Sequence, residues 1–596
     1  MYQAARYLHA ADHGLVVEFG DAIAPEIAAK VRSLTYAIER AGLPGVKECI
    51  PTYRSVLVVF DPEQVEPEWL EARVRELESH LESVELPPPA LVEVPTAYGG
   101  EFGPDLPDVA AHTGLSPEEV IRLHSSVNYL VYMLGFTVGY PYLGGMPEQL
   151  ATPRLKNPRG CVPAGSVGIA GPQTGIYPVD SPGGWRIIGR TPLKLYDPSR
   201  NPPVLFRPGD YLKFVPISLS EFEEIRRQVE EGTYKVKGLD LQVGSTHLSV
   251  EQEGEQGNRF DGLEVLEPGL HTTIQDLGRF GYQKYGMPPS GVMDRFSAMM
   301  ANALVGNNLG QAVLEVTLAG PRLKALRDLW VAVTGAEFHP QVNGKPVSQW
   351  ETLHLREGDE LHLGSASTGC RAYIAVKGGF AVPPVLGSRS TYVKGAIGGI
   401  QGRRLQRGDR LPCYQAVSTS QRALRLPESF RPVFGGECTV RAVPGPQDDY
   451  FTQEGLEAFF SQPYTVTPQS DRMGIRLSGA PIKHKGKSDI ISDGIAWGSV
   501  QVPGDQQPIV LLADRQTTGG YPKIATTIWA DLDLLGQLRP GDKLRFEKVD
   551  VATAYHLAKE RSARIKKAIE AMSSPKTRTF IMRVNGVEHR VSVEEL

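Results

Sequence analysis

The stretch LRPGDKL (538–544) places a glycine-aspartate pair just before alternating apolar residues, and this pattern occurs four times in the chain. The other copies are FRPGDYL (206–212), LREGDEL (355–361) and LQRGDRL (405–411). In each copy the Gly-Asp pair predicts a turn, and the alternation that follows predicts a strand. The four copies therefore indicate a fold built from β-sheets.

Two of these copies also follow similar longer phrases. VPAGSVGIAGPQTGIYP (162–178) precedes the first copy, and VPGDQQPIVLLADRQTTGGYP (502–522) precedes the last. Because order as well as composition is shared, the pattern predicts a duplicated β-barrel-like unit. The 63 glycines and 47 prolines favour the same β-dominated fold over helical bundles.

The first part of the chain has a different pattern. Strands are predicted in GLVVEFGD and YRSVLVVFD, and amphipathic helices in IAAKVRSLTYAIERAG and PEWLEARVRELESHLES. Strand, helix, strand and helix predict a small α/β unit. With 596 residues the chain is long enough for about three or four units. The predicted divisions are an α/β unit (1–90), a β-barrel unit (91–240), a linker (241–262), two further barrel units (263–430 and 431–572, the second with a C-terminal helix) and a tail (573–596) with a hairpin around Asn585-Gly586.

The bulk composition excludes several classes of protein. A formal net charge of −5 and a pI near 6.3 argue against a nucleic-acid or anionic-membrane surface. The N-terminus lacks the features of a signal peptide and no apolar run could span a bilayer, so we expect a cytoplasmic protein. The five cysteines are far apart and form no CxxC pair, so we predict neither a disulfide framework nor a metal site.

The first half offers a histidine in the stretch LHSSVNYLVYMLGFTVGYPYLGG. His124, Asn128 and Tyr132 are four residues apart and could share one face of a helix, with His124 as a base. A packed core histidine is the alternative, and the spacing alone favours it. Downstream, the glycine-rich loop CVPAGSVGIAGPQTGIYPVDSPGGW allows backbone to approach a ligand, although the same residues also make tight turns. Its candidate pocket residues are Gln173, Thr174, Tyr177, Asp180 and Ser181.

The second half offers acid-arginine pairs. Asp276 and Arg279 are three residues apart, and Asp294 precedes a helical run, where helix capping alone would explain it. SDRMGIRLSG (470–479) and ADRQTTGG (513–520) each contain Asp-Arg between glycines. An arginine fixed by its acid suits a carboxylate or phosphate, and plain surface ion pairs are the alternative.

Taken together, these motifs resemble the family of allophanate hydrolase subunit 1 and subunit 2. The family includes the B and C subunits of 5-oxoprolinase, the kinase inhibitor KipI with its antagonist KipA, and the carboxyltransferase half of urea carboxylase. The first-half motifs HSSVNYLVYMLGFTVGYPYLGG, ATPRLKNPR and VPAGSVGIAGPQTGIYPVDSPGGWRIIGRTP look like subunit 1. PGLHTTIQDLGRFGYQ, PPSGVMDRFS, SDRMGIRLSG and ADRQTTGGYPKIATTI look like subunit 2. The chain departs from the family's usual GFxPGFPYLGG, because Val138 and Tyr140 stand for proline and phenylalanine.

The resemblance implies a β-dominated α+β fold, with cyclophilin-like barrels after the α/β unit, one in the first half and two in tandem in the second. It implies ATP-dependent opening of 5-oxoproline to glutamate, with a separate A subunit of 5-oxoprolinase, a small amide substrate, and ATP and Mg²⁺ bound by this chain or by the partner. The first alternative is a biotin-dependent carboxyltransferase acting on urea or a related amide. Its biotin would arrive on a carrier protein, because the tail FIMRVNGVEHRVSVEEL stops before any biotinylation site. The second alternative is a KipI/KipA-like regulator of a histidine kinase, and a homo-oligomer is left open.

The resemblance also suggests site residues. Arg472, Arg515 and Lys523 are the candidate phosphate ligands, and the charges Asp514, Arg515 and Lys523 are what the repeat PQTGIYP lacks. The proposed catalytic set is His124, Asp294, Asp514 and Arg515. The proposed substrate or nucleotide ligands are Asn128, Tyr142, Arg154, Gln173, Thr174, Tyr177, Ser181, Gln275, Asp276, Arg279, Gln447, Asp471, Arg472, Gln516, Thr518, Tyr521 and Lys523.

Overall fold

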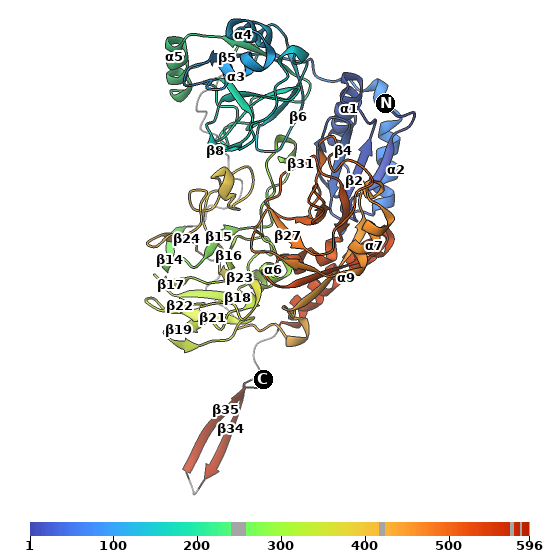
Figure 1. Ribbon diagram of the computed structural model, residues 1–596. Coiled ribbons are helices and arrows are strands. Elements are labelled where there is room, and N and C mark those ends of the chain that lie inside the picture. Colours follow the sequence, from blue (N-terminus) through green and yellow to red (C-terminus); the bar gives the residue numbers. More distant parts are fainter. Residues whose placement is uncertain (240–257, 416–422, 573–576, 585–586, 595–596) are drawn as a thin grey trace.

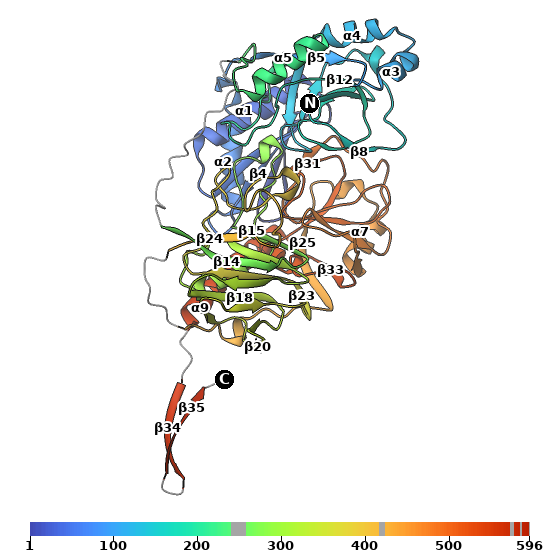
Figure 2. The same cartoon turned by 90° about the vertical axis from the view of Figure 1, so that its left-hand side faces the viewer.

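The computed structural model describes residues 1–239, 258–415, 423–572, 577–584 and 587–594. Most of the predicted linker (241–262) therefore lies outside the described residues. The predicted β-dominated barrel fold is confirmed. Figures 1 and 2 both show the first barrel and the β-sandwich that follows at opposite ends of the molecule, with the N-terminal unit beside the last barrel.

The N-terminal unit is an antiparallel sheet covered by two helices. The sheet has the order β1-β2-β4-β3, and its strands are β1 (Arg6–His9), β2 (Gly14–Glu18), β3 (Val46–Pro51) and β4 (Ser55–Phe60). Helix α1 (Pro25–Ala41) begins with proline, whose fixed φ suits a first helical position, and α2 (Pro67–Glu78) begins in the same way. Both predicted helices and the strands β2 and β4 are confirmed. The strands β1 and β3 were not predicted.

The first barrel unit is a seven-stranded sheet in the order β10-β9-β12-β5-β13-β6-β7. Its strands are β5 (Leu91–Tyr98), β6 (Tyr129–Leu134), β7 (Pro141–Gly144), β9 (Ser166–Ala170), β10 (Gln173–Ile176), β12 (Arg186–Arg190) and β13 (Tyr211–Pro216), with β8 (Arg159–Val162) and β11 (Ser181–Gly183) as a separate pair. Helices α3 (Leu106–Thr113) and α4 (Pro117–Ser125) connect β5 to β6, and α5 (Leu219–Glu230) follows β13.

The last barrel repeats this strand order and closes. Its strands are β25 (Glu437–Pro444), β26 (Tyr464–Val466), β27 (Gly474–Ser478), β29 (Ser499–Gln501), β30 (Ile509–Leu511), β32 (Lys523–Thr527) and β33 (Lys543–Lys548). Read from β30, the order is β30-β29-β32-β25-β33-β26-β27, which matches the first unit strand for strand. Both units also pair their first and last strands in parallel, β5 with β13 and β25 with β33. The described residues thus carry two copies of one topology.

The unit between them, predicted as a further barrel, is a sandwich of two separate sheets. One sheet has the order β20-β19-β22-β17-β14-β24, and the other has the order β15-β16-β23-β18-β21. Its strands are β14 (Arg259–Glu267), β15 (His271–Gln275), β16 (Val313–Thr317), β17 (Arg322–Ala325), β18 (Leu329–Glu337), β19 (Gln341–Val342), β20 (Lys345–Pro346), β21 (Thr352–Leu355), β22 (Glu360–His362), β23 (Thr368–Val376) and β24 (Arg410–Tyr414). Buried side chains from both sheets, such as Val265 and Ile374, form one core.

The four Gly-Asp turns share one geometry. Each glycine (Gly209, Gly358, Gly408 and Gly541) has a φ of +87° to +96°, which an L side chain rarely adopts. Each following aspartate accepts a hydrogen bond from the backbone N–H three residues earlier, at 2.7–3.0 Å. The strands β13, β22, β24 and β33 begin directly after these turns. The repeated sequence therefore encodes a repeated turn into a strand.

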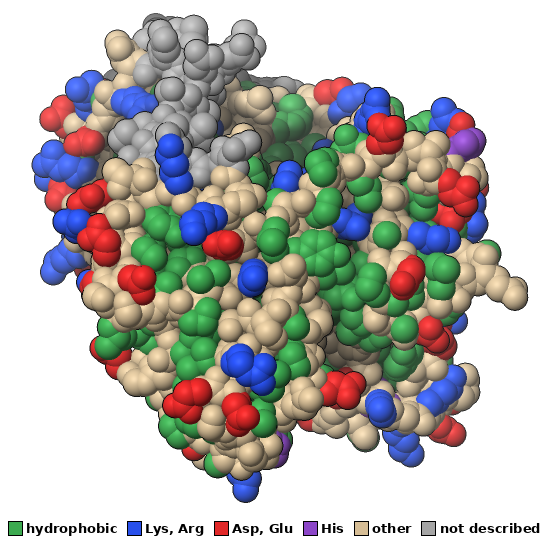
Figure 3. Space-filling view, turned by 90° about the horizontal axis from the view of Figure 1, so that it is seen from above, with side chains coloured by type: hydrophobic (Ala, Val, Ile, Leu, Met, Phe, Trp, Pro, Cys, Tyr) green, Lys and Arg blue, Asp and Glu red, His purple; other side chains and the backbone are tan. Residues whose placement is uncertain are grey.

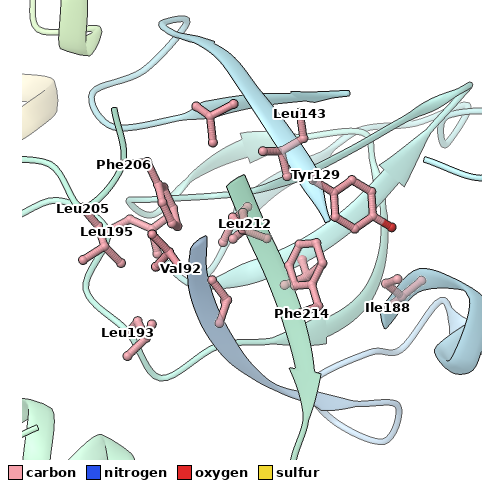
Figure 4. Close-up of a cluster of buried hydrophobic side chains, with 14 of the residues drawn as sticks. Val92, Tyr129, Leu143, Ile188, Leu193, Leu195, Leu205, Phe206, Leu212 and Phe214 are labelled. Carbon is pink, nitrogen blue, oxygen red and sulfur yellow. The ribbon is translucent and has the colours of Figure 1, made fainter. Parts of the chain in front are cut away.

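Buried apolar side chains fill the first barrel. Figure 4 shows rings of Tyr129, Phe206 and Phe214 beside Leu212 and Val92. All five are at most 1% exposed. This density of rings and branched chains fixes the interior, so a polar side chain inside it must find its partners within the protein.

The C-terminal part contains a long helix and a hairpin. Helix α9 (Val551–Ala571) packs against the last barrel, and β34 (Thr577–Val584) pairs with β35 (Val587–Glu594), which confirms the predicted hairpin. Its turn, Asn585-Gly586, lies outside the described residues, and Figures 1 and 2 draw the hairpin apart from the body. Among the described helices, none is long and apolar enough to cross a membrane. On the face in Figure 3, acidic and basic side chains are interspersed.

Candidate functional site

The loop 513–523 links the last barrel to every other unit. It runs from β30 to β32 and contains β31 (Thr518–Gly519), which pairs with β28 (Asp493–Gly494). In Figure 1, β31 lies toward the first barrel, beside β4 of the N-terminal unit. Because successive side chains of the loop point to different neighbours, its residues fall into separate environments.

Asp514 belongs to a buried ion network. Arg472 donates to it from Nε at 2.9 Å and from Nη2 at 3.2 Å, and also donates to Glu315 of the sandwich and to the Gly291 carbonyl. Arg371 Nε lies 3.6 Å from Oε1 of the same glutamate. Burial lowers the pKa of Arg472, but the charges of Asp514 and Glu315 outweigh burial and raise it above its ordinary value. This network joins the last barrel to the sandwich.

Arg515 is also engaged inside the protein. It donates to the carbonyls of Ile495 and Leu512 at 3.0 and 3.2 Å, and to Gln283 Oε1 at 2.8 Å. Gln283 in turn donates to Glu48 of the N-terminal unit at 2.7 Å. Burial lowers the pKa of Arg515 to about 10, so it remains charged at neutral pH. Its fork binds protein atoms instead of a ligand.

Lys523 forms a buried ion pair with Asp493, with Nζ and Oδ2 2.9 Å apart. The same carboxylate accepts hydrogen bonds from Ser55 Oγ of β4 and from Gln447 Nε2, the latter at 3.1 Å. Burial raises the pKa of Asp493, but Lys523 and Arg54 hold it below its ordinary value. The predicted residues Gln447 and Lys523 therefore lie together, in the contact with the N-terminal unit.

Thr518 connects the loop to aromatic side chains of the first half. Its Oγ1 accepts from the Phe136 backbone N–H at 3.2 Å, and its side chain hydrogen-bonds Tyr142. Tyr142 contacts the rings of Tyr53 and Tyr140, with centroids 5.7 and 5.2 Å away. Burial raises the pKa of Tyr142, so its phenol stays protonated at neutral pH. This tyrosine cluster joins three units and presents neutral hydroxyl groups.

Several predicted residues of the first half border the tyrosine cluster. Gln173 Nε2 donates to Tyr53 OH at 3.3 Å, and the Tyr177 ring lies 6.2 Å from that of Tyr140. Arg154 is exposed, and its charge lowers the pKa of Tyr140 and Tyr142 against the larger effect of burial. The structure thus brings Tyr142, Arg154, Gln173, Tyr177 and Thr518 into one neighbourhood.

A cavity of about 250 Å³ adjoins the loop, and we name it the Gln516 cavity. The predicted residues Asp471, Gln516 and Tyr521 line it. Its other lining residues are Lys394, Gln469, Met473, Gly474, Arg476, Gln501, Ile509 and Leu511. Side-chain amides and a guanidinium therefore face one space, a combination suited to a small molecule with an amide and an acid group.

A second cavity, of about 410 Å³, lies between the sandwich and the last barrel, and we name it the His271 cavity. Asp471, Arg472 and Asp514 line it together with His271, which begins β15. Burial and then the charge of Arg472 lower the pKa of His271, so this imidazole is neutral at neutral pH. The two cavities share Lys394, Asp471 and Met473 as a wall.

His124 is a core residue, which corrects its prediction as a base. It is 0% exposed, and both ring nitrogens are engaged, Nδ1 with Tyr98 OH and Nε2 with Thr174 Oγ1, each at 2.8 Å. Burial lowers its pKa to about 3. Thr174 is likewise buried and so is removed from the predicted pocket.

The predicted helix face of His124, Asn128 and Tyr132 does not exist. Helix α4 begins with a capping box between Ser116 and Glu119 and ends at Ser125. Strand β6 starts at Tyr129, so Asn128 is an exposed connecting residue and Tyr132 packs on Tyr53. The four-residue spacing predicted one helix face, but the helix ends at Ser125, before Asn128 and Tyr132.

Asp294 caps helix α6 (Arg295–Leu304), as the alternative interpretation predicted. It accepts from Ser297 N at 2.9 Å, from Ser297 Oγ at 2.6 Å and from Gln537 Nε2 at 2.7 Å. Burial raises its pKa to about 7. Its oxygens therefore serve the helix start and the contact with Gln537.

Four further predicted ligands hold loops together. Asp276 accepts from Ser388 and Ser390 hydroxyls at 2.7 and 2.6 Å, and it makes no ion pair with Arg279 among the described side chains. The remaining contacts are Arg279 Nε to Val385 O (2.9 Å), Gln275 Nε2 to Thr391 O (3.0 Å) and Ser181 Oγ to Val179 O (3.2 Å). These side chains bind hydroxyl groups or backbone carbonyls of neighbouring segments.

The cations predicted to hold ATP do not fit that role. Arg472, Arg515 and Lys523 already bind acids or carbonyls and are at most 7% exposed. A phosphate would have to displace buried ion pairs, which is costly. Within the part of the chain that the structure describes, no three His, Cys, Asp or Glu side chains are grouped to hold a metal ion.

The structure identifies functional candidates that the sequence analysis missed, namely Arg476, Gln501 and His271. Arg476 lies on β27 between the buried residues Ile475 and Leu477, so strand alternation predicts its outward direction. No comparable local signal marks Gln501 or His271. Their role follows only from the cavities they line.

Two family models match most of the chain. "Carboxyltransferase domain, subdomain C and D" matches residues 5–206, and "Carboxyltransferase domain, subdomain A and B" matches residues 285–548. The crystal structure of TTHA0988 superposes with a TM-score of 0.75 at 34% identity, covering 89% of this chain and 99% of that chain.

Three curated relatives each match a part of the chain. The protein is 38% identical to the C subunit of 5-oxoprolinase from Escherichia coli, over 49% of this chain and 93% of that relative. It is 44% identical to the B subunit of 5-oxoprolinase from Bacillus subtilis, over 36% of this chain and 95% of that relative. It is 34% identical to urea amidolyase of Lachancea kluyveri, over 53% of this chain but only 18% of that protein.

Proposed function

This chain belongs to the carboxyltransferase-domain family that includes the B and C subunits of 5-oxoprolinase, and we propose that it is a fused B and C component of an ATP-dependent 5-oxoprolinase. In this proposal it opens 5-oxoproline to glutamate together with a separate A subunit.

One observation carries the proposal: a single chain covers 95% of one B subunit, together with 93% of one C subunit. The loop 513–523 supports it, because Thr518 reaches the tyrosine cluster of the B-like half while Gln516 and Tyr521 line a cavity of the C-like half. Residues of both halves therefore contact the loop that borders the proposed site.

The Gln516 cavity offers groups that match 5-oxoproline, a lactam with one carboxylate. Side-chain amides of Gln501 and Gln516 can pair with the lactam carbonyl and N–H, since an amide both donates and accepts. Arg476 is exposed, has no side-chain partner among the described residues, and can bind the carboxylate in a fork. A substrate that lacks either group would leave a polar partner unpaired.

The proposed position of ATP depends on whether the buried cations of this chain are free to bind phosphate. Because Arg472, Arg515 and Lys523 are held by internal partners, we assign the nucleotide and its Mg²⁺ to the partner protein. The present chain then supplies the lactam site, and the neutral imidazole of His271 lines the adjoining cavity, which makes it the candidate proton carrier.

The experiment mixes the purified chain with a candidate A subunit, ATP and 5-oxoproline, and measures glutamate and ADP. We expect glutamate only when both proteins and ATP are present. Arg476→Ala should raise the KM for 5-oxoproline at least about tenfold, because a charged hydrogen bond is lost. Lys543→Ala, at an exposed position of the same barrel, is the matched control. Absence of ATP-dependent glutamate with an active A subunit would refute the proposal.

The family models favour one second candidate, transfer of a carboxyl group from biotin to a small amide. The same cavity amides would then hold urea or a related amide. Incubating the chain with a biotinylated carrier, biotin carboxylase, ATP and labelled bicarbonate separates the two proposals. Labelled carboxyl in urea would support transfer, whereas glutamate in the first assay would support ring opening.

A further inference from the structure

A third cavity lies away from the loop 513–523, where the N-terminal unit, the first barrel and the second half meet. It has a volume of about 190 Å³. Helix α1 forms one side, the Gly-Asp turn before β13 forms another, and the short helix η3 (Gln283–Tyr285) forms a third. The proline run 87–89, which lies between the N-terminal unit and the first barrel, forms a fourth side together with Pro51 and Leu86.

Two of the three cations around this cavity are paired. Lys284 Nζ lies 2.6 Å from Glu39 Oε1, and Arg207 Nε lies 3.4 Å from Asp210 Oδ2. Asp210 also accepts the Ala90 backbone N–H at 3.0 Å, so its oxygens are already engaged. Among the described residues, one cation of the cavity therefore has no directly paired acid.

That cation is Arg32 of α1. Its guanidinium is half-buried and has no hydrogen bond or ion pair within the described residues. It lies against Gly209, where a Cβ atom would overlap Nη1. Burial lowers its pKa, with the charges of Tyr211 and Asp210 opposing that effect, so an added anion would stabilise it. A partly desolvated arginine beside a cavity is stabilised when an anion binds next to it.

We propose that this cavity binds a small organic carboxylate, held by Arg32 and packed against the proline run and the rings of Tyr36 and Tyr285. A planar guanidinium matches the two oxygens of a carboxylate, and the volume admits only a compact body. The apolar proline and tyrosine walls suit an organic acid better than an inorganic ion.

Such a ligand would touch every unit around the cavity. It would contact Arg32 and Tyr36 from the N-terminal unit, Arg207 from the first barrel and Tyr285 from the second half. Because a ligand stabilises the arrangement that it binds, a carboxylate here would hold the three units in their mutual positions. The site is thus placed to regulate, and none of its lining residues lies in the Gln516 or His271 cavity.

The test titrates the full chain with benzoate and with 5-oxoproline by calorimetry, using benzamide as the uncharged control. We expect saturable binding of at least one acid and none of benzamide. Arg32→Leu should weaken that binding at least about tenfold, because a charge-assisted hydrogen bond is lost. Arg40→Leu, an exposed position on the same helix outside the cavity, should bind as the wild type does.

Hydrogen exchange of residues 25–41 gives a second measurement that does not depend on catalysis. A bound acid should slow exchange in α1 of the wild type and of Arg40→Leu, but not of Arg32→Leu. If neither acid binds, if benzamide binds as well as benzoate, or if Arg32→Leu binds with unchanged affinity, the proposed site does not exist. Binding that persists after Arg476→Ala distinguishes this site from the proposed lactam site.

Discussion

Arg472 holds Asp514 through two hydrogen bonds, from Nε to Oδ2 at 2.9 Å and from Nη2 to Oδ1 at 3.2 Å. The aspartate of one Asp-Arg motif thus binds the arginine of the other, and Glu315 of the sandwich joins them. Each motif alone suggested ligand binding, but the charge of Arg472 from one motif and that of Asp514 from the other neutralise each other inside the protein. Their main role is to fix the last barrel against the sandwich.

Asp514→Asn should therefore act on stability. The substitution removes one of the two acids that compensate Arg472, and breaking a buried pair costs about 3 kcal/mol or more. Denaturant unfolding followed by tryptophan fluorescence would show a lower midpoint. Asp489→Asn, at an exposed position, is the control and should unfold as the wild type does. A variant with wild-type stability but no activity would instead assign Asp514 a catalytic role.

Gly135→Ala should loosen the contact between the first barrel and the loop 513–523. A Cβ at this position would overlap Thr518 Oγ1, and the branched, buried threonine has little room to move. Overpacking of this kind costs about 1–3 kcal/mol. Gly160→Ala is the control, since a Cβ there meets no atom within 4 Å. The double variant Gly135→Ala/Thr518→Ala should lose less stability than the two single effects summed, and strict additivity would contradict the contact.

The sequence predicted those parts of the fold that depend on local rules. The Gly-Asp turns have a required backbone conformation at glycine, so the four repeats marked four real turns. The shared order around residues 162–178 and 502–522 likewise marked two sheets with one topology. Helix α1 followed from its apolar spacing, although it begins before the predicted stretch, at Pro25.

The site was harder to predict because contacts with residues far away in the sequence decide which of its polar side chains are paired inside the protein. Nothing near Arg472 indicates that Glu315, far away in the chain, will take its guanidinium. Arg476, four residues later, could have been found, because it alternates with buried Ile475 and Leu477 on β27. The spacing of His124 and Asn128 misled because α4 ends between them.

His124 should make the protein less stable in acid. Its folded pKa is about 3, below the ordinary value of about 6.5, so the unfolded chain binds the proton more readily. Its contribution to stability is complete above pH 6.5 and is lost as pH falls toward 3. Between pH 7 and pH 5 the loss is about 2 kcal/mol.

The measurement is the free energy of unfolding at several pH values for the wild type and His124→Gln. His124→Gln should have a smaller free energy of unfolding than the wild type at pH 7, but that free energy should change less between pH 7 and pH 5. His112→Gln, at an exposed position on α3, should keep the wild-type slope. A wild-type slope in His124→Gln would show that this imidazole does not titrate in the way that its burial implies.

Lys523→Met should destabilise the protein most, and in a way that depends on pH. The variant leaves Asp493 buried with Arg54 as its remaining nearby cation among the described residues, and an uncompensated buried charge costs about 3–5 kcal/mol. Burial, no longer opposed by Lys523, should raise the folded pKa of Asp493 above its unfolded value of about 3.9. The folded variant then binds a proton more readily than the unfolded chain does.

The gap in stability between wild type and Lys523→Met should therefore narrow as pH falls from 7 to 5, because protonation relieves the buried charge. Unfolding curves at both pH values, with Lys487→Met as the exposed control, measure this gap. Lys523→Met/Asp493→Asn should recover part of the loss at pH 7, because the uncompensated charge is gone. A gap that stays constant with pH, together with no recovery in the double variant, would mean that Lys523 stabilises the protein by packing and not by its charge.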